Sequence, residues 1–560
     1  MERPPVGTSL PRVDGVAKVT GRARYLDDLD APGAWHGATV RSTIAHGVLE
    51  AIDLDPAFDW SKVVVVTAAD VPGRNVIALI EDDQPALVAI GSKVMHVDEA
   101  IALVAAPTRE LAFAAARAVR PRVRPLPAVF DLDRSLARDQ LLYGTDNVFK
   151  QFLIRKGHTS DAEFEAILAR APHVIDGTYS TSPQEQMYIE PQAMMAEWRD
   201  GRCFLVGSMQ CPYYVHKAMK ALLGCGPDGV IVTQSVTGGG FGGKEEYPSM
   251  LAAHVALLAS KAKRGVKIVY DRDEDIAATT KRHPARTHHR LAYDDRGELV
   301  AIDVDCVMDG GAYLTLSPVV LSRGVLHAAG PYRCPVVRVR GRVVATNHPP
   351  HGAFRGFGAP QTTFAYERQI DKLARARGED PLACRKRLAL RSGDTTATGQ
   401  RLGASVGTDE VIAAVEKVMG PAPEHPGERV RRGRGLAFYF LGAGFTGSGE
   451  QRLAGRATVA YTPAGRYEVR ASSTDIGQGA TTIFTQIAAH ALGVDPSLID
   501  VIDPTTSLVP DSGPTVASRT CMVVGGLVEK AAKALVEKLR EPVEGEVAVT
   551  MQYEPPPGIH

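Results

Sequence analysis

The sequence has no excess of either charge, no long apolar run and few cysteines. Lys and Arg together number 64 among 560 residues, and so do Asp and Glu, which gives a formal net charge of zero. We therefore expect neither nucleic acid nor an anionic membrane as a partner, because both attract a basic surface. No stretch approaches the roughly 20 uninterrupted apolar residues that cross a bilayer, and Met1–Pro5 lacks the apolar core of a secretory signal. The expectation is a soluble, cytoplasmic protein.

The cysteines are too widely spaced to predict a metal or iron–sulfur centre. They never form the C-x2-C or C-x4-C pattern that wraps a zinc ion or an iron–sulfur cluster. Their dispersion favours reduced, mostly buried thiols. If the protein transfers electrons, we expect the iron–sulfur and flavin centres to be on other chains. The seven cysteines are Cys203, Cys211, Cys225, Cys306, Cys334, Cys384 and Cys521.

The length predicts several domains, because a single hydrophobic core rarely grows beyond about 250–300 residues. Residues 1–130 alternate short apolar runs with turns and contain one Ala-rich helix, which predicts a mixed α/β domain. A proline-containing segment at about 120–150 is predicted to be a linker. Residues 145–395 are predicted to form a second α/β domain, and residues 425–560 a third one of related composition.

Some helix and strand ends can be predicted from single residues. Pro212 begins a predicted helix that Gly224 ends, in keeping with the preference for proline first and glycine last. A long Ala/Leu-rich helix is predicted at residues 247–262. The last predicted strand, residues 547–553, has no obvious partner strand. The third domain is therefore predicted to be incomplete.

Four glycine-rich loops are the most unusual feature. The first, Thr237–Glu246, has five glycines between a strand and a helix, so that backbone N–H groups can approach a ligand closely. It nearly fits a phosphate-binding loop, but Glu245 stands where a hydroxyl should hold Mg²⁺. A purely structural turn is the other interpretation. The other three loops are Pro349–Gln361, Thr474–Ala480 and Pro510–Thr520.

The other three loops each suggest a ligand contact. In Pro349–Gln361, two aromatic residues and one arginine among glycines predict a slot for a planar ligand, or else a loop held by buried rings. Thr474–Ala480 runs into a helix N-terminus, where free N–H groups favour an anionic oxygen. Pro510–Thr520 offers hydroxyls and backbone donors. Taken singly, the last two loops are typical of surface turns.

Three histidines suggest a metal site, although their pattern does not support one. His283, His288 and His289 flank Pro284 and Arg286 without the spacing of a helical or Cys/His metal site. A solvated or packing role is the more favoured interpretation.

Taken together, the loops resemble the molybdenum hydroxylase family, the xanthine dehydrogenases and their relatives, over nearly the whole chain. Gly15–Gly21 and Tyr25–Asp28 resemble the entry to the small α/β hammerhead domain of that family, and Glu190–Ala193 resembles its next signature. The four loops follow in the order of the family. The resemblance implies an α+β multidomain fold, with an N-terminal hammerhead domain followed by two related molybdenum-cofactor-binding domains, the second of them incomplete.

The resemblance also implies a cofactor that the protein surrounds without bonding to its metal. In this family a pyranopterin dithiolene holds the molybdenum, so no protein ligand to the metal is expected. Whether the pterin is molybdopterin or its cytosine dinucleotide stays open. Partner subunits are expected to carry [2Fe-2S] and FAD. The residues implied to contact the cofactor are Gln210, Gly240, Phe241, Gly242, Phe354, Arg355, Gln478, Gly479, Ala517 and Ser518.

Four further residues resemble those that recognise the substrate. Glu245 matches the carboxylate that xanthine-type members direct at the heterocycle, and Arg323 matches the arginine that steadies developing negative charge. The resemblance gives both a catalytic and a substrate-binding role. Phe357 resembles a ring that stacks on the substrate, and Phe445 a second one. The alternatives are a surface ion pair of Glu245 with Lys244 and a structural salt bridge for Arg323.

One departure from the family pattern concerns the catalytic base. Relatives carry a glutamate in a Gly-Glu-Pro-Pro-like segment near the end of this subunit. Glu554-Pro555-Pro556 resembles it only superficially, because Tyr553 replaces the glycine and the position falls too early. The base glutamate is therefore expected to be absent from this chain, which would be truncated, split from a second chain that supplies the segment, or inactive.

The resemblance thus implies the cofactor-binding subunit of an oxidoreductase. Its reaction would hydroxylate a purine or another N-heterocycle with oxygen derived from water and pass the electrons to the iron–sulfur and FAD subunits. A hydroxylase or oxidoreductase for aldehydes, nicotinate or an aromatic acyl-CoA is an alternative. A cofactor-binding fragment without catalytic activity is another.

Overall fold

A seven-stranded sheet joins the N-terminal part of the chain to the part that follows it. The structure is a computed structural model that describes residues 4–555, apart from 422, 424–426, 428, 446–448 and 543. The strand order is β11-β10-β9-β12-β1-β5-β3, and β1 meets β12 in parallel at Trp35 and Val266. One sheet thus contains strands from both the first and the second predicted range. Its strands are β1 (Trp35–Arg41), β3 (Val64–Val66), β5 (Ala100–Ala106), β9 (Ala193–Arg199), β10 (Arg202–Gly207), β11 (Val230–Gln234) and β12 (Val266–Val269).

Three helices on this sheet were predicted from the sequence, and the structure confirms them. Helix α5 (Pro212–Leu223) begins at the predicted proline and ends at Gly224, whose φ of 63° is left-handed. Helix α6 (Pro248–Ala262) is apolar on nearly every face and lies in the largest buried core, because such a helix has no polar face to give to solvent. Helix α2 (Arg109–Ala118) packs on β1 and β5.

The segment predicted as a linker begins with a strand instead. Residues Val119–Pro125 form β6, which pairs with β2 (Gly47–Leu54) in a sheet of order β4-β2-β6. The prolines misled the prediction, because an edge strand tolerates residues that have no N–H to donate. Strand β4 (Lys93–Val94) and helix α3 (Leu132–Leu136) complete this region.

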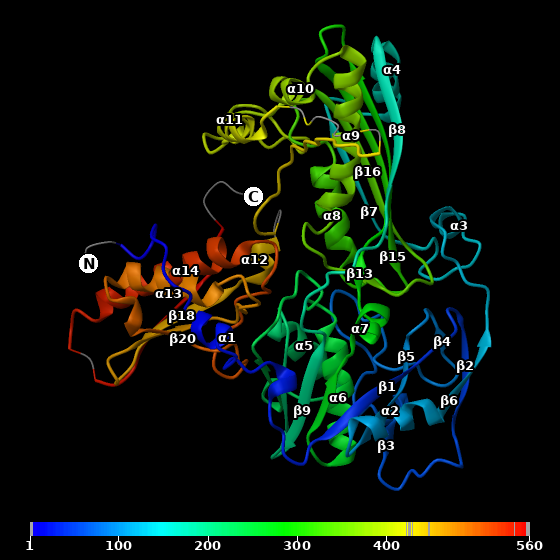
Figure 1. Ribbon diagram of the computed structural model, residues 1–560, viewed down its shortest axis with the longest axis vertical. Helices are drawn as coiled ribbons and strands as arrows, with labels where there is room; N and C mark the ends of the chain where they lie inside the picture. Colours follow the sequence, from blue (N-terminus) through cyan, green and yellow to red (C-terminus); the bar gives the residue numbers. More distant parts are fainter. Residues whose placement is uncertain are drawn as a thin grey trace.

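A long five-stranded sheet forms the upper part of the molecule in Figure 1, and α8 (Ser317–His327) and α9 (Ala359–Arg377) pack against it. Its order is β7-β16-β15-β14-β8. The strands are β7 (Val148–Lys156), β8 (His173–Thr181), β14 (Ala285–Tyr293), β15 (Leu299–Gly311) and β16 (Val336–Ala345). Between this sheet and the seven-stranded sheet, β13 (Lys281–Arg282) pairs with β17 (His351–Gly352). Further helices are α4 (Asp161–Arg170), α7 (Arg272–Ala278), α10 (Pro381–Leu388) and α11 (Thr408–Met419).

The C-terminal part is a four-stranded sheet with helices α13 (Ala480–Leu492) and α14 (Gly525–Lys538) packed on it. The prediction that the last strand has no partner is wrong. Strand β21 (Val547–Gln552) pairs with β18 (Arg456–Tyr461) along its whole length, because Val549 completes the apolar face under α14. The other strands are β19 (Tyr467–Arg470) and β20 (Ile499–Val501), and α12 (Gly449–Leu453) precedes the sheet.

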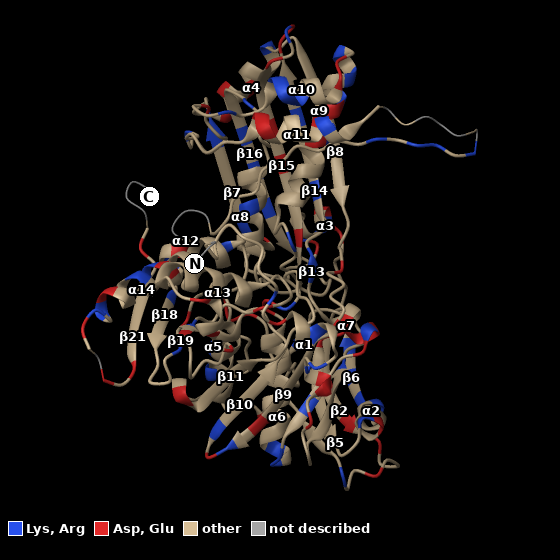
Figure 2. Cartoon of the chain, turned by 60° about the vertical axis from the view of Figure 1, so that its left-hand side comes forward, with Lys and Arg blue, Asp and Glu red and all other residues tan. Residues whose placement is uncertain are grey.

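The N-terminal segment crosses to this C-terminal part, where Figure 1 shows α1 (Gly15–Val19) beside it. The side-chain amide of Gln486 on α13 donates to the carbonyls of Pro5 and Thr8. Both signs of charge are spread over the molecule in Figure 2. Within the described residues, no helix is long and apolar enough to cross a membrane.

Gly37 tests the junction between β1 and β12. A Cβ atom on Gly37 would lie 2.7 Å from Ile268 Cγ1 and 2.8 Å from Leu258 Cδ1. We expect Gly37→Val to lower the free energy of unfolding by about 1–3 kcal/mol, because the packed core cannot accept the added volume. Scanning calorimetry of the variant measures this as a lower apparent Tm. Gly226→Val is the control, since no atom lies within 4 Å of a Cβ there; equal Tm values for the two variants would contradict the packing at this junction.

Candidate functional site

Gln210 connects three of the four glycine-rich loops. Its side-chain oxygen accepts from the N–H of Gly242 at 2.8 Å, and its side-chain nitrogen donates to the carbonyl of Thr515 at 3.1 Å. Its backbone carbonyl accepts from the hydroxyl of Thr474 at 3.1 Å. Gln210 is buried and lies just before α5. Loops that are far apart in the sequence therefore meet at one residue, Gln210.

The remaining loop, Pro349–Gln361, packs directly on the first. The N–H of Arg355 donates to the carbonyl of Phe241 at 2.9 Å. A Cβ atom on Gly242 would lie 2.8 Å from the backbone of Ala353, so only glycine allows this approach. The guanidinium of Arg282 covers the ring of Phe354 at 4.0 Å and donates to the carbonyl of Arg355. Sequence reasoning missed Arg282, because nothing local marks it as a support for this loop.

Several residues of these loops have a strained backbone. Phe241, Phe357, Ala517 and Ser518 have φ between 50° and 55°, a left-handed conformation that costs free energy for residues other than glycine. A π-helical turn, Thr520–Val524, follows the fourth loop. Such strain persists where the surroundings fix the backbone, and it is frequent at ligand sites.

Several donors on the loops have no partner in the described part of the chain. The amide groups of Phe241, Gly479, Ala517 and Ser518 donate no hydrogen bond to another described residue. The side chain of Arg355 is exposed, and 44% of Phe241 is exposed. Gln478 differs, because its side chain bonds within its own loop, to Thr474 and Ile476. The unpaired amides and the free guanidinium suit an anionic ligand.

Glu245 is buried without a basic partner. Only 3% of the residue is exposed, and its carboxyl makes no hydrogen bond or ion pair to a described residue. Burial, together with the charge of Glu246, raises its pKa well above the ordinary value. The surface pair with Lys244 is wrong, since Lys244 is fully buried and its ammonium lies 2.9 Å from the carboxylate of Glu190.

Arg323 is also buried, and it has no counter-ion among the described residues. It lies on α8 with 6% exposed, and its guanidinium donates to the carbonyls of Gly442 at 2.5 Å and Gly444 at 2.6 Å. A structural salt bridge is therefore wrong as its explanation. The N–H of Gly444 donates in turn to the carbonyl of Ala517 at 2.7 Å, which ties Arg323 to the fourth loop. Burial lowers the pKa of Arg323.

Phe357 and Phe445 are the two rings that were predicted to stack on the substrate. Phe357 is half-buried and packs against the core of the upper sheet. Phe445 is half-buried, and its N–H donates to Glu450 at 3.0 Å. Glu450 and Arg519 form a buried ion pair at 2.9 Å that fixes this loop beside Ser518. Sequence reasoning missed that pair, because its members are 69 residues apart.

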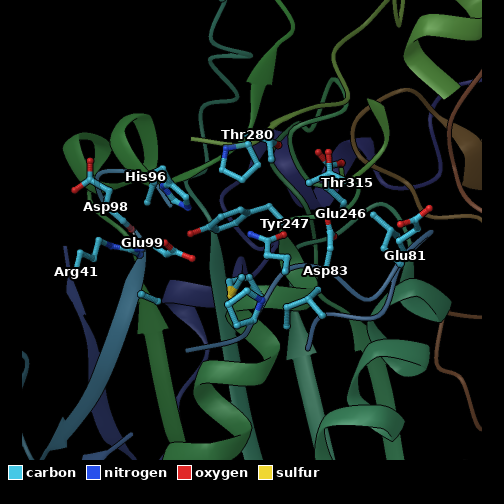
Figure 3. Close-up of a pocket in the computed structure, with 18 residues that line it drawn as sticks. Arg41, Glu81, Asp83, His96, Asp98, Glu99, Glu246, Tyr247, Thr280 and Thr315 are labelled. Atoms are coloured by element: carbon cyan, nitrogen blue, oxygen red, sulfur yellow. Dashed lines mark hydrogen bonds between the residues drawn. The ribbon is translucent and has the colours of Figure 1, made fainter. Parts of the chain in front are cut away.

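Glu246, the neighbour of Glu245, faces a separate acidic cavity (Figure 3). Asp83, Glu99 and Thr280 also line it. Burial raises the pKa of Asp83 to about 6, and that of Glu99 and Glu246 to about 7. Protons are therefore held here at pH values where exposed carboxyls have lost them.

Stability should depend on pH through Glu99. Its folded-state pKa lies above the ordinary 4.5, so the folded state binds the extra proton between these values, and the free energy of unfolding falls as the pH rises toward 7. Glu99→Gln removes the titrating carboxyl. We therefore expect the apparent Tm of this variant to fall less than that of the wild type between about pH 5 and pH 8. Glu81→Gln, at the exposed rim of the same cavity, is the control and should follow the wild type. Parallel profiles for Glu99→Gln and the wild type would refute the prediction.

Comparisons with known proteins agree with the resemblance drawn from the sequence. Models of the molybdopterin cofactor-binding domain match residues 144–389 and 421–553. A model of the aldehyde oxidase and xanthine dehydrogenase a/b hammerhead domain matches residues 20–127. The predicted fold class, a hammerhead domain followed by two cofactor-binding domains, is confirmed.

Individual relatives cover most of the chain. It is 32% identical to a probable xanthine dehydrogenase subunit of Bacillus subtilis, over 95% of this chain and 71% of that protein. It is 34% identical to the nicotinate dehydrogenase large molybdopterin subunit of Eubacterium barkeri, over 75% of this chain and 96% of that one. The solved aldehyde oxidoreductase of Desulfovibrio gigas superposes with a TM-score of 0.84 at 28% identity, and the match covers 98% of this chain but only 63% of that one. The chain belongs to the xanthine dehydrogenase and aldehyde oxidase family of molybdopterin-binding oxidoreductases.

Proposed function

We propose that the chain is the substrate-oxidising subunit of a molybdenum hydroxylase that acts on a purine or another N-heterocycle. One observation carries the proposal: Glu245 and Arg323 are both buried, on or tied to the glycine-rich loops, and neither has a charged partner among the described residues. Burying an ionisable group without a counter-charge costs several kcal/mol. A substrate that uses both groups accounts for that cost.

The loops fit the cofactor that the family binds. The amides of Phe241, Ala517 and Ser518 and the guanidinium of Arg355, which have no partner among the described residues, are donors for the anionic groups of a pterin phosphate. When bound, the molybdenum group supplies the transferred oxygen and accepts the electrons of the substrate. The residues proposed to hold it are Gln210, Gly240, Phe241, Gly242, Phe354, Arg355, Gln478, Gly479, Ala517 and Ser518.

Glu245 and Arg323 are proposed to bind and orient the heterocycle. Because its pKa is well above the ordinary value, the carboxyl of Glu245 can hold a proton and donate it to a ring nitrogen or carbonyl oxygen. Arg323 keeps its positive charge, and the carbonyls of Gly442 and Gly444 fix its direction. It would stabilise negative charge that develops on the substrate. Phe357 and Phe445 are proposed to stack on the ring.

The chain is proposed to work with iron–sulfur and FAD subunits in the cytoplasm. The Bacillus subtilis and Eubacterium barkeri relatives support this, since the name of each describes one subunit of a larger enzyme. All seven cysteines are free thiols, which suits a reducing compartment.

Nicotinate and aldehydes are the alternative substrates. The nicotinate dehydrogenase relative favours the first, and Arg323 offers a cation for a substrate carboxylate. The aldehyde oxidoreductase relative favours the second, but a simple aldehyde lacks the ring nitrogen that the buried carboxyl of Glu245 can bind.

Arg323→Met tests the role of the guanidinium. In the complex with its partner subunits, we expect kcat/KM for hypoxanthine to fall by about 100-fold or more, because stabilisation of developing charge is lost. Molybdenum content per chain, measured by plasma mass spectrometry, should stay unchanged. Arg368→Met, an exposed position on α9, should alter neither value. Equal losses of activity and molybdenum in Arg323→Met would assign Arg323 to folding instead.

Testing hypoxanthine, nicotinate and benzaldehyde side by side separates the candidate substrates. A wild-type complex that oxidises only benzaldehyde would overturn the assignment to N-heterocycles.

A further inference from the structure

Three metal-ligating side chains converge beside the loop of Pro349–Gln361. They are Asp309 on β15, His348 in the loop after β16 and His351 on β17, and one donor atom from each lies within 4.8 Å of the others. His348 Nδ1 is 2.7 Å from Asp309 Oδ2, and His351 Nε2 is 3.9 Å from the same oxygen. The three donors thus surround one small region of space.

The buried imidazole of His351 has no side-chain hydrogen-bond partner among the described residues. Its side chain is only 5% exposed, and neither ring nitrogen makes a hydrogen bond within the described part of the chain. An unpaired buried polar group costs about 1–3 kcal/mol, and the great majority of such groups in proteins are satisfied. Both ring nitrogens of the buried His289 are unpaired as well. It is therefore the nearness of Asp309 and His348 that marks His351 as a ligand.

The carboxylate is held so that one oxygen faces the histidines. Asp309 Oδ1 accepts from the N–H of Gly311 at 2.8 Å and from the hydroxyl of Thr346 at 2.7 Å. Oδ2 is left to His348 and His351. Hydrogen bonds that orient a ligating carboxylate in this way are a regular feature of metal sites.

We propose that Asp309, His348 and His351 bind one divalent transition-metal ion, with zinc as the best match. Two imidazoles and one carboxylate are ligands that zinc prefers, whereas Ca²⁺ and Mg²⁺ prefer six or more oxygens. Zinc–nitrogen bonds of about 2.0–2.1 Å place tetrahedral donors about 3.3 Å apart, and the observed 2.7 Å and 3.9 Å lie on either side of that value. His348 is 40% exposed, which gives the ion a route of entry and leaves a fourth position for water.

This ion would be structural and distinct from the proposed cofactor. It would fasten residues 346–352 to β15, and the same segment continues directly into Phe354, Arg355 and Phe357. The histidines singled out in the sequence do not form it. His283 instead contacts Ser317 at 2.8 Å, His288 pairs with Asp176 on the surface, and His289 is buried. The pair His348-x-x-His351 was missed because its third ligand lies 39 residues before His348.

Metal analysis of the purified complex tests the proposal. After exchange into chelator-treated buffer, we expect about one zinc per chain in the wild type. We expect His348→Gln to bind zinc at least about tenfold more weakly, because one of three ligands is lost. His288→Gln is the matched control, since His288 also pairs with a carboxylate, 43% of its side chain is exposed, and it has no third donor nearby among the described residues; it should retain zinc like the wild type.

A cobalt titration gives a second readout that does not depend on activity. Co²⁺ added to metal-stripped wild type should produce the visible absorption of a four-coordinate site, and His348→Gln should not. The proposal is overturned if the wild type retains no more zinc than His348→Gln, if His288→Gln loses as much, or if only Mg²⁺ or Ca²⁺ is retained. In each case the contact of His348 with Asp309 would be an ordinary ion pair.

Discussion

The candidate site depends on the close approach of three glycine-rich loops around Gln210, with the fourth loop packed on the first. The side-chain amide of Gln210 donates a hydrogen bond to the carbonyl of Thr515 and accepts one from the N–H of Gly242. The loops can reach this distance only because glycine has no side chain at Gly240, where a Cβ would lie 2.5 Å from Gln210 Oε1. The left-handed backbone at Ala517 and Ser518 is part of the same constraint. These contacts thus join the first cofactor-binding domain, residues 144–389, to the second, residues 421–553.

Charge pairing in the surroundings makes the unpaired groups of the site informative. Lys244 pairs with Glu190, and Arg519 pairs with Glu450, although all four are largely buried. These two ion pairs satisfy buried charges that support the loops. Among the described residues, Glu245 and Arg323 have no such counter-charge. Arg282 has none either, and its guanidinium contacts Phe354, Gln184 and the carbonyl of Arg355 instead. Buried ionisable groups without counter-charges are frequent at sites that bind or transform a ligand.

Local chemistry made some of these features predictable, and tertiary contacts decided the rest. Helix α5 follows from Pro212 and Gly224, because helix ends are set by a few neighbouring residues. Strand β6 was taken for a linker, because only its place at a sheet edge makes its prolines acceptable. The glycine-rich loops were recognisable from composition, whereas Arg282 and the Glu450–Arg519 pair were not, since each acts across a long stretch of sequence. The partner of Lys244 was missed for the same reason.

The central claim is that the loops joined at Gln210 hold a molybdenum cofactor. Its most direct test is the molybdenum and pterin content of the chain, purified with its companion subunits from a host that makes the cofactor. The account predicts molybdenum in the wild type, loss of most of it in Gln210→Ala, and retention in Gln369→Ala, which removes a fully buried glutamine from α9. Circular dichroism would verify that both variants are folded. A wild type without molybdenum, or a folded Gln210→Ala with a full complement, would contradict the account.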